Sequence, residues 1–166
     1  KIPLKITKEG KAKALKAFYA ELEKAMIDLA KKIVLDGEGA KKFIEITVTN
    51  AKTVTSAKKI CFSIANSLLV KTAIAGEDAN WGRLIMAIGK TKINLKIENI
   101  KIYIQNFLLC ENGKAINTID DSKLSLALKR KTVNIKVDLG EGGREFTVWT
   151  SDLTEDYVRI NADYRS

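Results

Sequence analysis

Histidine is absent from the 166 residues of this chain. Catalysis by Ser-His-Asp or Cys-His groups is therefore excluded within the chain, as is any metal site that uses histidine. Only two cysteines occur, Cys61 and Cys110, each inside an apolar stretch. Two cysteines are too few for a structural zinc site, and their apolar surroundings indicate buried free thiols rather than a disulfide. We predict a cytoplasmic protein without a metal or a cofactor.

Arginine, aromatic residues and long apolar runs are also scarce. Five of the 29 basic residues are arginine, the aromatic share is 7%, and the net charge is +9. Proteins that read nucleic acids depend on arginine and on aromatic stacking, whereas the lysines here are scattered along the chain. We expect no nucleic-acid partner, although a basic nucleic-acid-binding module and a purely structural domain stay open as alternatives to an enzyme. The longest apolar runs, such as residues 84–88, are too short to cross a bilayer, so we expect no membrane association.

The chain has one proline, at position 3, and shows no internal repeat, low-complexity tract or linker. Residues 1–166 are therefore predicted to form a single domain. The first residues read KIPLK, without a methionine or the apolar core of a signal peptide. We expect that this start was produced by processing or by design.

The first half of the chain reads mainly as helices. Apolar residues at spacings of three and four, beginning with Leu15 and Phe18, predict a long amphipathic helix that ends at a pair of glycines. The predicted elements of this half are a helix over residues 11–35, a half-buried strand over 43–49, a helix capped by Thr53 or Thr55, a short interior strand over 70–75, and a helix over 81–88.

The second half is richer in strands. An Asn-Gly pair favours a hairpin turn, and alternating apolar residues favour strands. The predicted elements are strands over residues 93–98 and 101–109, a hairpin turn at 111–114, a short helix capped by Asp120 or Asp121, strands around 133–139 and 146–148 joined as a second hairpin by the turn at 140–143, and a helical turn begun by Thr154. This pattern indicates an α+β fold, with helices interleaved with a mostly antiparallel sheet.

Three stretches are unusual for a purely structural chain. Glu38 lies between two glycines directly after the long helix, where the helix dipole disfavours a carboxylate. Residues 76–83 place a tryptophan between an asparagine and a glycine at a helix start, which favours a packing role. The last residues, 161–166, follow tyrosine and isoleucine at near-helical spacing, which indicates that this end docks on the protein rather than frays.

The same three stretches resemble motifs of the ornithine acetyltransferases (glutamate N-acetyltransferases) of arginine biosynthesis. Residues 36–43 read DGEGAKKF and resemble the family's DGEGA-x-KF. Residues 69–83 contain LVKTA and GEDANWGR, which are similar to LVKTA and GxDPNWGR. Residues 152–164 read DLTEDYVRINADY and resemble DLT-x-x-YV-x-INA-x-Y. The order and spacing match from about residue 20 to the end.

The resemblance implies an enzyme whose precursor cleaves itself before a threonine, which then acts as the nucleophile of the second chain. Acetyl would pass from N-acetylornithine to this threonine and then to glutamate, and some members also accept acetyl-CoA. The family forms a heterotetramer with an α/β sandwich fold. This chain resembles the C-terminal part of the second (beta) chain. We therefore expect the alpha chain and the N-terminal part of the beta chain as partners, no catalytic residue in these 166 residues, and no acetyl transfer by them alone.

The resemblance also implies three substrate-binding residues, Glu38, Asn161 and Ser166. The Glu38 carboxylate can accept a charge-assisted hydrogen bond from a substrate ammonium group. The Asn161 amide and the Ser166 hydroxyl can donate to the carboxylate oxygens of a substrate. We therefore expect these residues, which lie far apart in the sequence, to converge in the folded protein.

Overall fold

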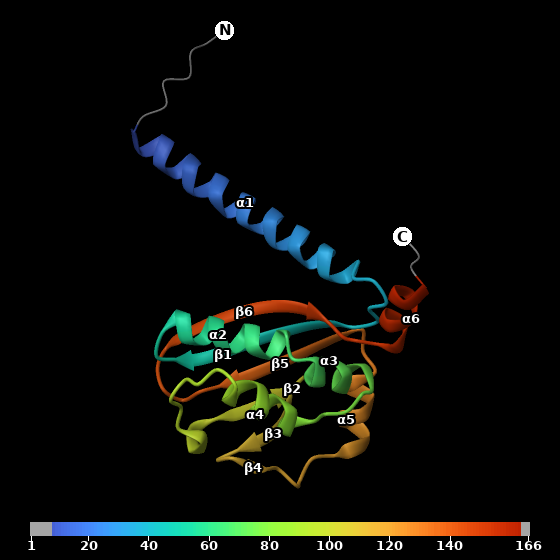
Figure 1. The fold of residues 1–166 in the computed structure, drawn as a ribbon. Coiled ribbons are helices and arrows are strands. Elements are labelled where there is room, and N and C mark those ends of the chain that lie inside the picture. Colours follow the sequence, from blue (N-terminus) through green and yellow to red (C-terminus); the bar gives the residue numbers. More distant parts are fainter. Residues whose placement is uncertain (1–7, 164–166) are drawn as a thin grey trace. The chain divides into compact units, whose positions relative to one another are not determined.

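The computed structural model of this chain describes residues 8–163. These residues form six α-helices, one short 3₁₀-helix and six β-strands (Figure 1). The chain divides into two compact units, one that ends at Ile33 and one that begins at Val34. The described part of the first unit is helical, whereas the second unit holds the whole sheet and the remaining helices.

The strands form one mixed sheet of order β4-β3-β2-β5-β1-β6. β1 pairs with β5 in parallel, and the other neighbouring strands pair antiparallel. The predicted α+β class with a mostly antiparallel sheet is therefore confirmed. The strands are β1 (Phe43–Ala51), β2 (Lys101–Ile104), β3 (Phe107–Glu111), β4 (Lys114–Ala115), β5 (Thr132–Asp138) and β6 (Arg144–Ser151).

Helices pack on one face of this sheet. α2 lies against β1 and β6, and α4 packs on α2 and α3 (Figure 1). Ile44 and Ile46 of β1 and Ile60 and Ile64 of α2 are fully buried in the resulting core. The helices are α1 (Lys8–Leu35), α2 (Val54–Ala65), α3 (Leu68–Ala75), α4 (Trp81–Gly89), the 3₁₀-helix η1 (Ile97–Asn99), α5 (Asp121–Leu128) and α6 (Glu155–Asp163).

The opposite face of the sheet carries polar side chains. The hydroxyls of Thr47 and Thr147 lie 3.0 Å apart, and Trp149 Nε1 donates to Glu45 Oε2 over 2.8 Å. Thr132, Asn134 and Lys136 of β5 are exposed, whereas the residues between them are buried. This one-sided packing explains the alternation of apolar and polar residues that predicted the strands.

Side-chain caps confirm several predicted boundaries. Thr53 caps the N-terminus of α2, because its Oγ1 accepts from the backbone N of Ser56 over 3.0 Å. Asp120 begins α5 in the same way. Asn112 and Gly113 have φ angles of 54° and 70° and form the predicted turn between β3 and β4. Local chemistry was sufficient for these elements.

The prediction of a strand over residues 70–75 was wrong, because these residues form helix α3. Ser67 caps this helix by accepting from the backbone N of Val70. The buried residues are Val70, Ala73 and Ile74, a helical spacing of three and four. A short apolar run is ambiguous between the two structures, and the capping serine was the signal for a helix.

The prediction of a strand over residues 93–98 was also wrong. Apart from the start of η1, these residues form a loop. Ile93 and Leu95 pack against the edge of the core, and they line a small apolar hollow with Ile85 and Ile88 of α4. The alternation of apolar residues therefore reflects the packing of a loop on a helix rather than strand pairing.

Strands β5 and β6 do not form the predicted hairpin, because β1 lies between them. Their connection instead wraps around the end of β1. The backbone N of Glu141 and of Gly142 both donate to Asn50 O, over 2.9 and 2.8 Å. A Cβ atom on Gly142 would lie 2.4 Å from Ala51 O, so this passage requires a glycine. The glycines permit a close crossover rather than a tight hairpin turn.

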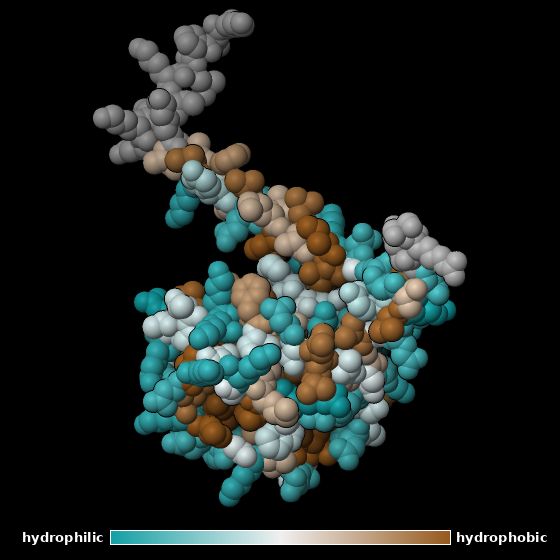
Figure 2. Space-filling view, viewed as in Figure 1, coloured by the Kyte–Doolittle hydropathy of each residue, from teal (hydrophilic) through white to brown (hydrophobic). Residues whose placement is uncertain are grey.

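Helix α1 confirms the long predicted helix and extends it to Lys8. Its apolar stripe is solvent-exposed, and apolar side chains are visible along the helix in Figure 2. The stripe consists of Leu15 (53% exposed), Phe18 (60%), Leu22 (40%), Met26 (62%), Leu29 (60%) and Ile33 (74%). Among residues 8–163, no helix combines the length and the apolar character that a membrane span requires.

Candidate functional site

Glu38 lies in a tight loop between the end of α1 and the start of β1. The backbone N of Ala40 donates to Gly37 O over 3.0 Å, which closes the turn around Glu38. Gly39 has a φ angle of 68°, and a Cβ atom at this position would lie 2.5 Å from the backbone N of Tyr157. The loop can therefore lie against the first turn of α6 only because residue 39 has no side chain.

Asn161 of α6 contacts Glu38 directly. Its amide Nδ2 donates to Glu38 Oε2 over 2.9 Å and to the backbone O of Tyr157, one helical turn earlier, over 2.8 Å. Both amide hydrogens are thus engaged, so Asn161 does not have the free donor that the sequence analysis expected for a substrate carboxylate, and its carbonyl oxygen Oδ1 is the atom that it can offer to a ligand. Glu38 and Asn161 are both exposed enough to meet one. Ser166, the third predicted site residue, lies outside the described residues.

The segment that leads into α6 holds the Glu38 loop from one side. Asp152 Oδ1 accepts from the backbone N of Lys41 and of Lys42, over 2.9 and 3.0 Å. The backbone N of Asp152 donates to Lys42 O over 3.1 Å. Thr154 Oγ1 donates to Gly39 O over 2.6 Å. Residues 39–42 therefore follow a path set by residues 152–154.

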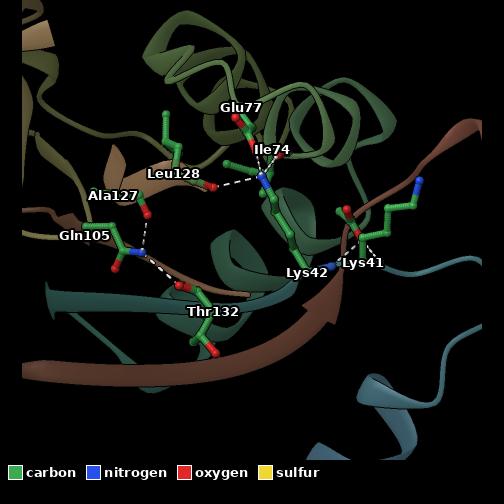
Figure 3. Close-up of polar contacts among 9 residues, drawn as sticks. Lys41, Lys42, Ile74, Glu77, Gln105, Ala127, Leu128 and Thr132 are labelled. Atoms are coloured by element: carbon green, nitrogen blue, oxygen red, sulfur yellow. Dashed lines mark hydrogen bonds and ion pairs between the residues drawn. The ribbon is translucent and has the colours of Figure 1, made fainter. Parts of the chain in front are cut away.

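The Lys42 side chain fixes the start of β1 from another direction (Figure 3). Its Nζ donates to Leu128 O over 2.8 Å and to Ile74 O over 3.3 Å, and it forms an ion pair of 3.1 Å with Glu77. Leu128 is the last residue of α5 and Ile74 lies in the last turn of α3, so the cation meets the negative ends of two helices. Lys42 is 9% exposed, and this set of acceptors offsets the cost of burying its charge.

The neighbouring Lys41 points outwards and pairs with α6. Its Nζ lies 2.7 Å from Asp156 Oδ2, and Asp156 also meets Arg159 over 2.8 Å. The hydrogen bond with Asp156 raises the pKa of Lys41, and the same bond lowers the pKa of Asp156. Because the pair is exposed, it contributes mainly to the orientation of α6.

Two hollows flank the Glu38 loop. One, of about 540 Å³, is lined by Lys41, by the end of α3 and by residues 153–156. The other, of about 430 Å³, is lined by Leu35, Lys131 and residues 40–43. Glu38 and Asn161 themselves line neither hollow. Both residues are exposed.

The second motif, residues 76–83, contacts the start of β1 through Glu77 and has a structural role, as its composition indicated. Asn80 Oδ1 caps α4 by accepting from the backbone N of Arg83 over 3.1 Å. Arg83 Nη1 in turn donates to Leu69 O over 2.9 Å and ties α4 to α3. Glu77 supplies the acid that meets Lys42. The motif thus supports the start of β1.

From the sequence, Thr154 is predicted only to begin a helical turn, and Asp152 and Lys42 have no predicted role. Asp152 and Thr154 belong to the third motif, yet a short acidic stretch before a helix is ordinarily read as capping. Lys42 is one of two adjacent lysines with nothing to distinguish the buried one. Its position directly before a strand was the only signal.

Comparisons with known proteins agree with these motifs. A family model described as the ArgJ family matches residues 4–166. The chain is 45% identical over 152 residues to the arginine biosynthesis bifunctional protein ArgJ of Agrobacterium fabrum. This match covers 92% of this chain and 37% of that protein. It is 47% identical over 149 residues to the protein of the same name from Mesorhizobium japonicum, covering 90% of this chain and 36% of that protein.

A solved structure gives the same result. The crystal structure of the arginine biosynthesis bifunctional protein from Bacillus halodurans superposes with a TM-score of 0.85 at 41% identity. The match covers 90% of this chain and 70% of that chain. The present chain thus spans little more than a third of the length of the curated relatives it matches.

Proposed function

We propose, from the fact that this chain belongs to the ArgJ family, that it supplies one wall of the substrate site of an acetyltransferase of arginine biosynthesis. The reaction moves acetyl from N-acetylornithine to glutamate through an N-terminal threonine nucleophile. That threonine belongs to polypeptide outside these 166 residues, which correspond to the C-terminal part of the second chain. The contact between Glu38 and Asn161 is the observation that carries this proposal.

Glu38 and Asn161 together suit a substrate ammonium group. One carboxylate oxygen of Glu38 receives the Asn161 amide, and the remaining acceptor capacity of the carboxylate faces solvent. Asn161 adds its carbonyl oxygen beside the same charge. Two acceptors of this kind can take two of the three donors of an ammonium group, and the hydrogen bond to the carboxylate is charge-assisted. Ser166, outside the described residues, completes the proposed set.

The exposed apolar stripe of α1 supports a polypeptide partner. A stripe of six large apolar side chains on one helix is the kind of surface that marks an interaction site. Its proposed occupant is the part of the family's protein that these 166 residues do not contain, because the chain spans 37% of its relative. The assembly is proposed to be the family's heterotetramer, in the cytoplasm, and the isolated chain to be inactive.

A substitution at Glu38 tests the function. In the full-length gene product, Glu38→Gln keeps the size of the side chain and removes its charge. Acetyl transfer from N-acetylornithine to glutamate should show a KM raised by about 10- to 100-fold, the value of one charge-assisted hydrogen bond. Glu145→Gln, on the exposed end of β6, is the matched control and should leave KM unchanged.

An unchanged KM in Glu38→Gln would remove Glu38 from the substrate site. A second assay uses residues 1–166 alone, which should show no transfer. Turnover by this chain in isolation would contradict the proposed position of the nucleophile.

A further inference from the structure

Asp152 holds its carboxylate in an unusual environment for a loop residue. It is 3% exposed, and its Oδ1 bridges the successive backbone N–H groups of Lys41 and Lys42. Its second oxygen, Oδ2, is also buried and has no hydrogen-bond partner among residues 8–163. Burying a carboxylate costs free energy, and here the compensating bonds all go to the backbone that follows Glu38.

Thr154 completes this arrangement at the other side of the loop. Its hydroxyl donates to Gly39 O over 2.6 Å, and it is part-buried. Asp152 and Thr154 thus bind the three residues 39, 41 and 42 from one short segment. Glu38 directly precedes them, so the direction of its side chain depends on the path they take.

Within the loop around Glu38, the turn is closed by the backbone N of Ala40, which donates to Gly37 O. Gly37 and Gly39 flank the carboxylate, and glycine loses more conformational freedom on ordering than any other residue. The Asn161 bond to Glu38 is exposed to solvent and therefore weak. Because residues 152–154 also lead directly into α6, they fix the loop and bring Asn161 to it at the same time.

We propose that Asp152 and Thr154 are positioning residues, which hold Glu38 in the orientation that meets the substrate. This inference rests on the proposed function of Glu38. Neither residue touches the acetyl group that would be transferred, so their loss acts on substrate binding through the orientation of Glu38. KM should therefore rise, while kcat changes little.

A double-mutant cycle in the full-length protein tests this coupling. Thr154→Val removes the hydroxyl at constant size and should raise the KM for N-acetylornithine by about three- to tenfold, the value of one neutral hydrogen bond. Thr154→Ser keeps the hydroxyl and should restore the original KM. In a Glu38→Gln background, Thr154→Val should raise KM no further, because the carboxylate that it positions is already gone.

The double-mutant cycle is repeated with Asp152→Ala, for which we expect a larger rise in KM than for Thr154→Val, and with Asp152→Asn for comparison. A general loss of stability would lower the melting temperature equally in both backgrounds, so it can be separated from the KM effect. If Asp152→Ala does not accumulate as folded protein, the Thr154 pair carries the test alone. Equal KM increases by Thr154→Val with and without the Glu38 carboxylate would overturn the positioning role. A Glu38→Gln protein with normal KM would instead overturn the proposed function, so the two failures are distinguishable.

Discussion

Asn161 Nδ2 donates a hydrogen bond to Glu38 Oε2 over 2.9 Å, although the two residues are separated by 123 positions in the sequence. The bond joins the loop before β1 to the last described helix. It brings together two of the residues that the family resemblance implied, at the same end of the sheet as the segment from Asp152 to Thr154.

Replacing Asn161 should change how the site responds to pH. Asn161→Asp would place two carboxylates about 3 Å apart, and their repulsion favours protonation of one of them. Because the proposed binding of an ammonium group requires a charged Glu38, the acidic limb of the kcat/KM profile of the full-length protein should move to higher pH. Asn161→Leu, which has no charge, should raise KM without moving that limb. Identical pH profiles for the two variants would contradict this interpretation.

Lys42 should be important for the stability of the unit that begins at Val34. Lys42→Met removes a cation that serves two helix ends and Glu77, and it takes the donor from the buried carbonyl of Leu128, whereas Ile74 O keeps the backbone N of Glu77. We expect a loss of about 2–5 kcal/mol in the free energy of unfolding by urea. Lys59→Met, on the exposed side of α2, is the matched control and should stay within about 0.5 kcal/mol. Equal effects of the two substitutions would show that the buried cation is dispensable.

Gly39 should not tolerate even the smallest side chain. Gly39→Ala combines a φ angle of 68° with a Cβ atom 2.5 Å from the backbone of Tyr157. The collision should displace α6, and hydrogen exchange should become faster in residues 155–163. Gly143→Ala, where a Cβ atom meets nothing within 4 Å, serves as the control. Unchanged exchange in α6 of Gly39→Ala would mean that the loop and the helix separate without cost.

The thiol of Cys61 should couple stability to alkaline pH. Burial raises the pKa of Cys61 to about 11. Well below its ordinary pKa of 9.0 the thiol is protonated in both states and has no effect on stability. Between about pH 9 and 11 the unfolded chain ionises first, so the free energy of unfolding should fall by about 1.4 kcal/mol per pH unit.

The measurement is the difference between the wild type and Cys61→Ala in urea unfolding at each pH, so that contributions from other groups cancel. This difference should be constant below pH 9 and shrink above it. In the folded protein at neutral pH, Cys61 should also resist alkylation until urea is added. Rapid alkylation without urea would contradict the burial of this thiol.

The apolar stripe of α1 should be needed for assembly. Leu22→Asp places a charge in the middle of the stripe, and we expect weaker co-purification of this chain with the remaining polypeptide of its family when the two are co-expressed. Ala20→Asp adds the same charge about 160° around the helix from Leu22 and should co-purify normally. Equal recovery with both variants would indicate that the stripe is not an interface.

Many elements of the fold could be read directly from the sequence, because short-range chemistry determines them. The caps at Thr53 and Asp120 and the turn at Asn112 depend on residues at most a few positions away. Periodicity identified α1 and β1 for the same reason. It was wrong for residues 70–75 and 93–98, where short apolar runs fit both a strand and the packing that forms in the folded chain.

The sequence by itself determined the family and the residues of the proposed site, since the motifs around Glu38 and Asn161 are contiguous and need no folding to be recognised. Only the tertiary structure decided how these motifs meet, that β1 enters between β5 and β6, and which of two adjacent lysines is buried. Three features depend on contacts across more than thirty residues: the order of the strands, the Asp152 carboxylate that binds the adjacent amides of Lys41 and Lys42, and the Lys42 ammonium at two helix ends. Local sequence patterns do not reveal such contacts, because each partner looks like an ordinary polar residue among its own neighbours in the sequence.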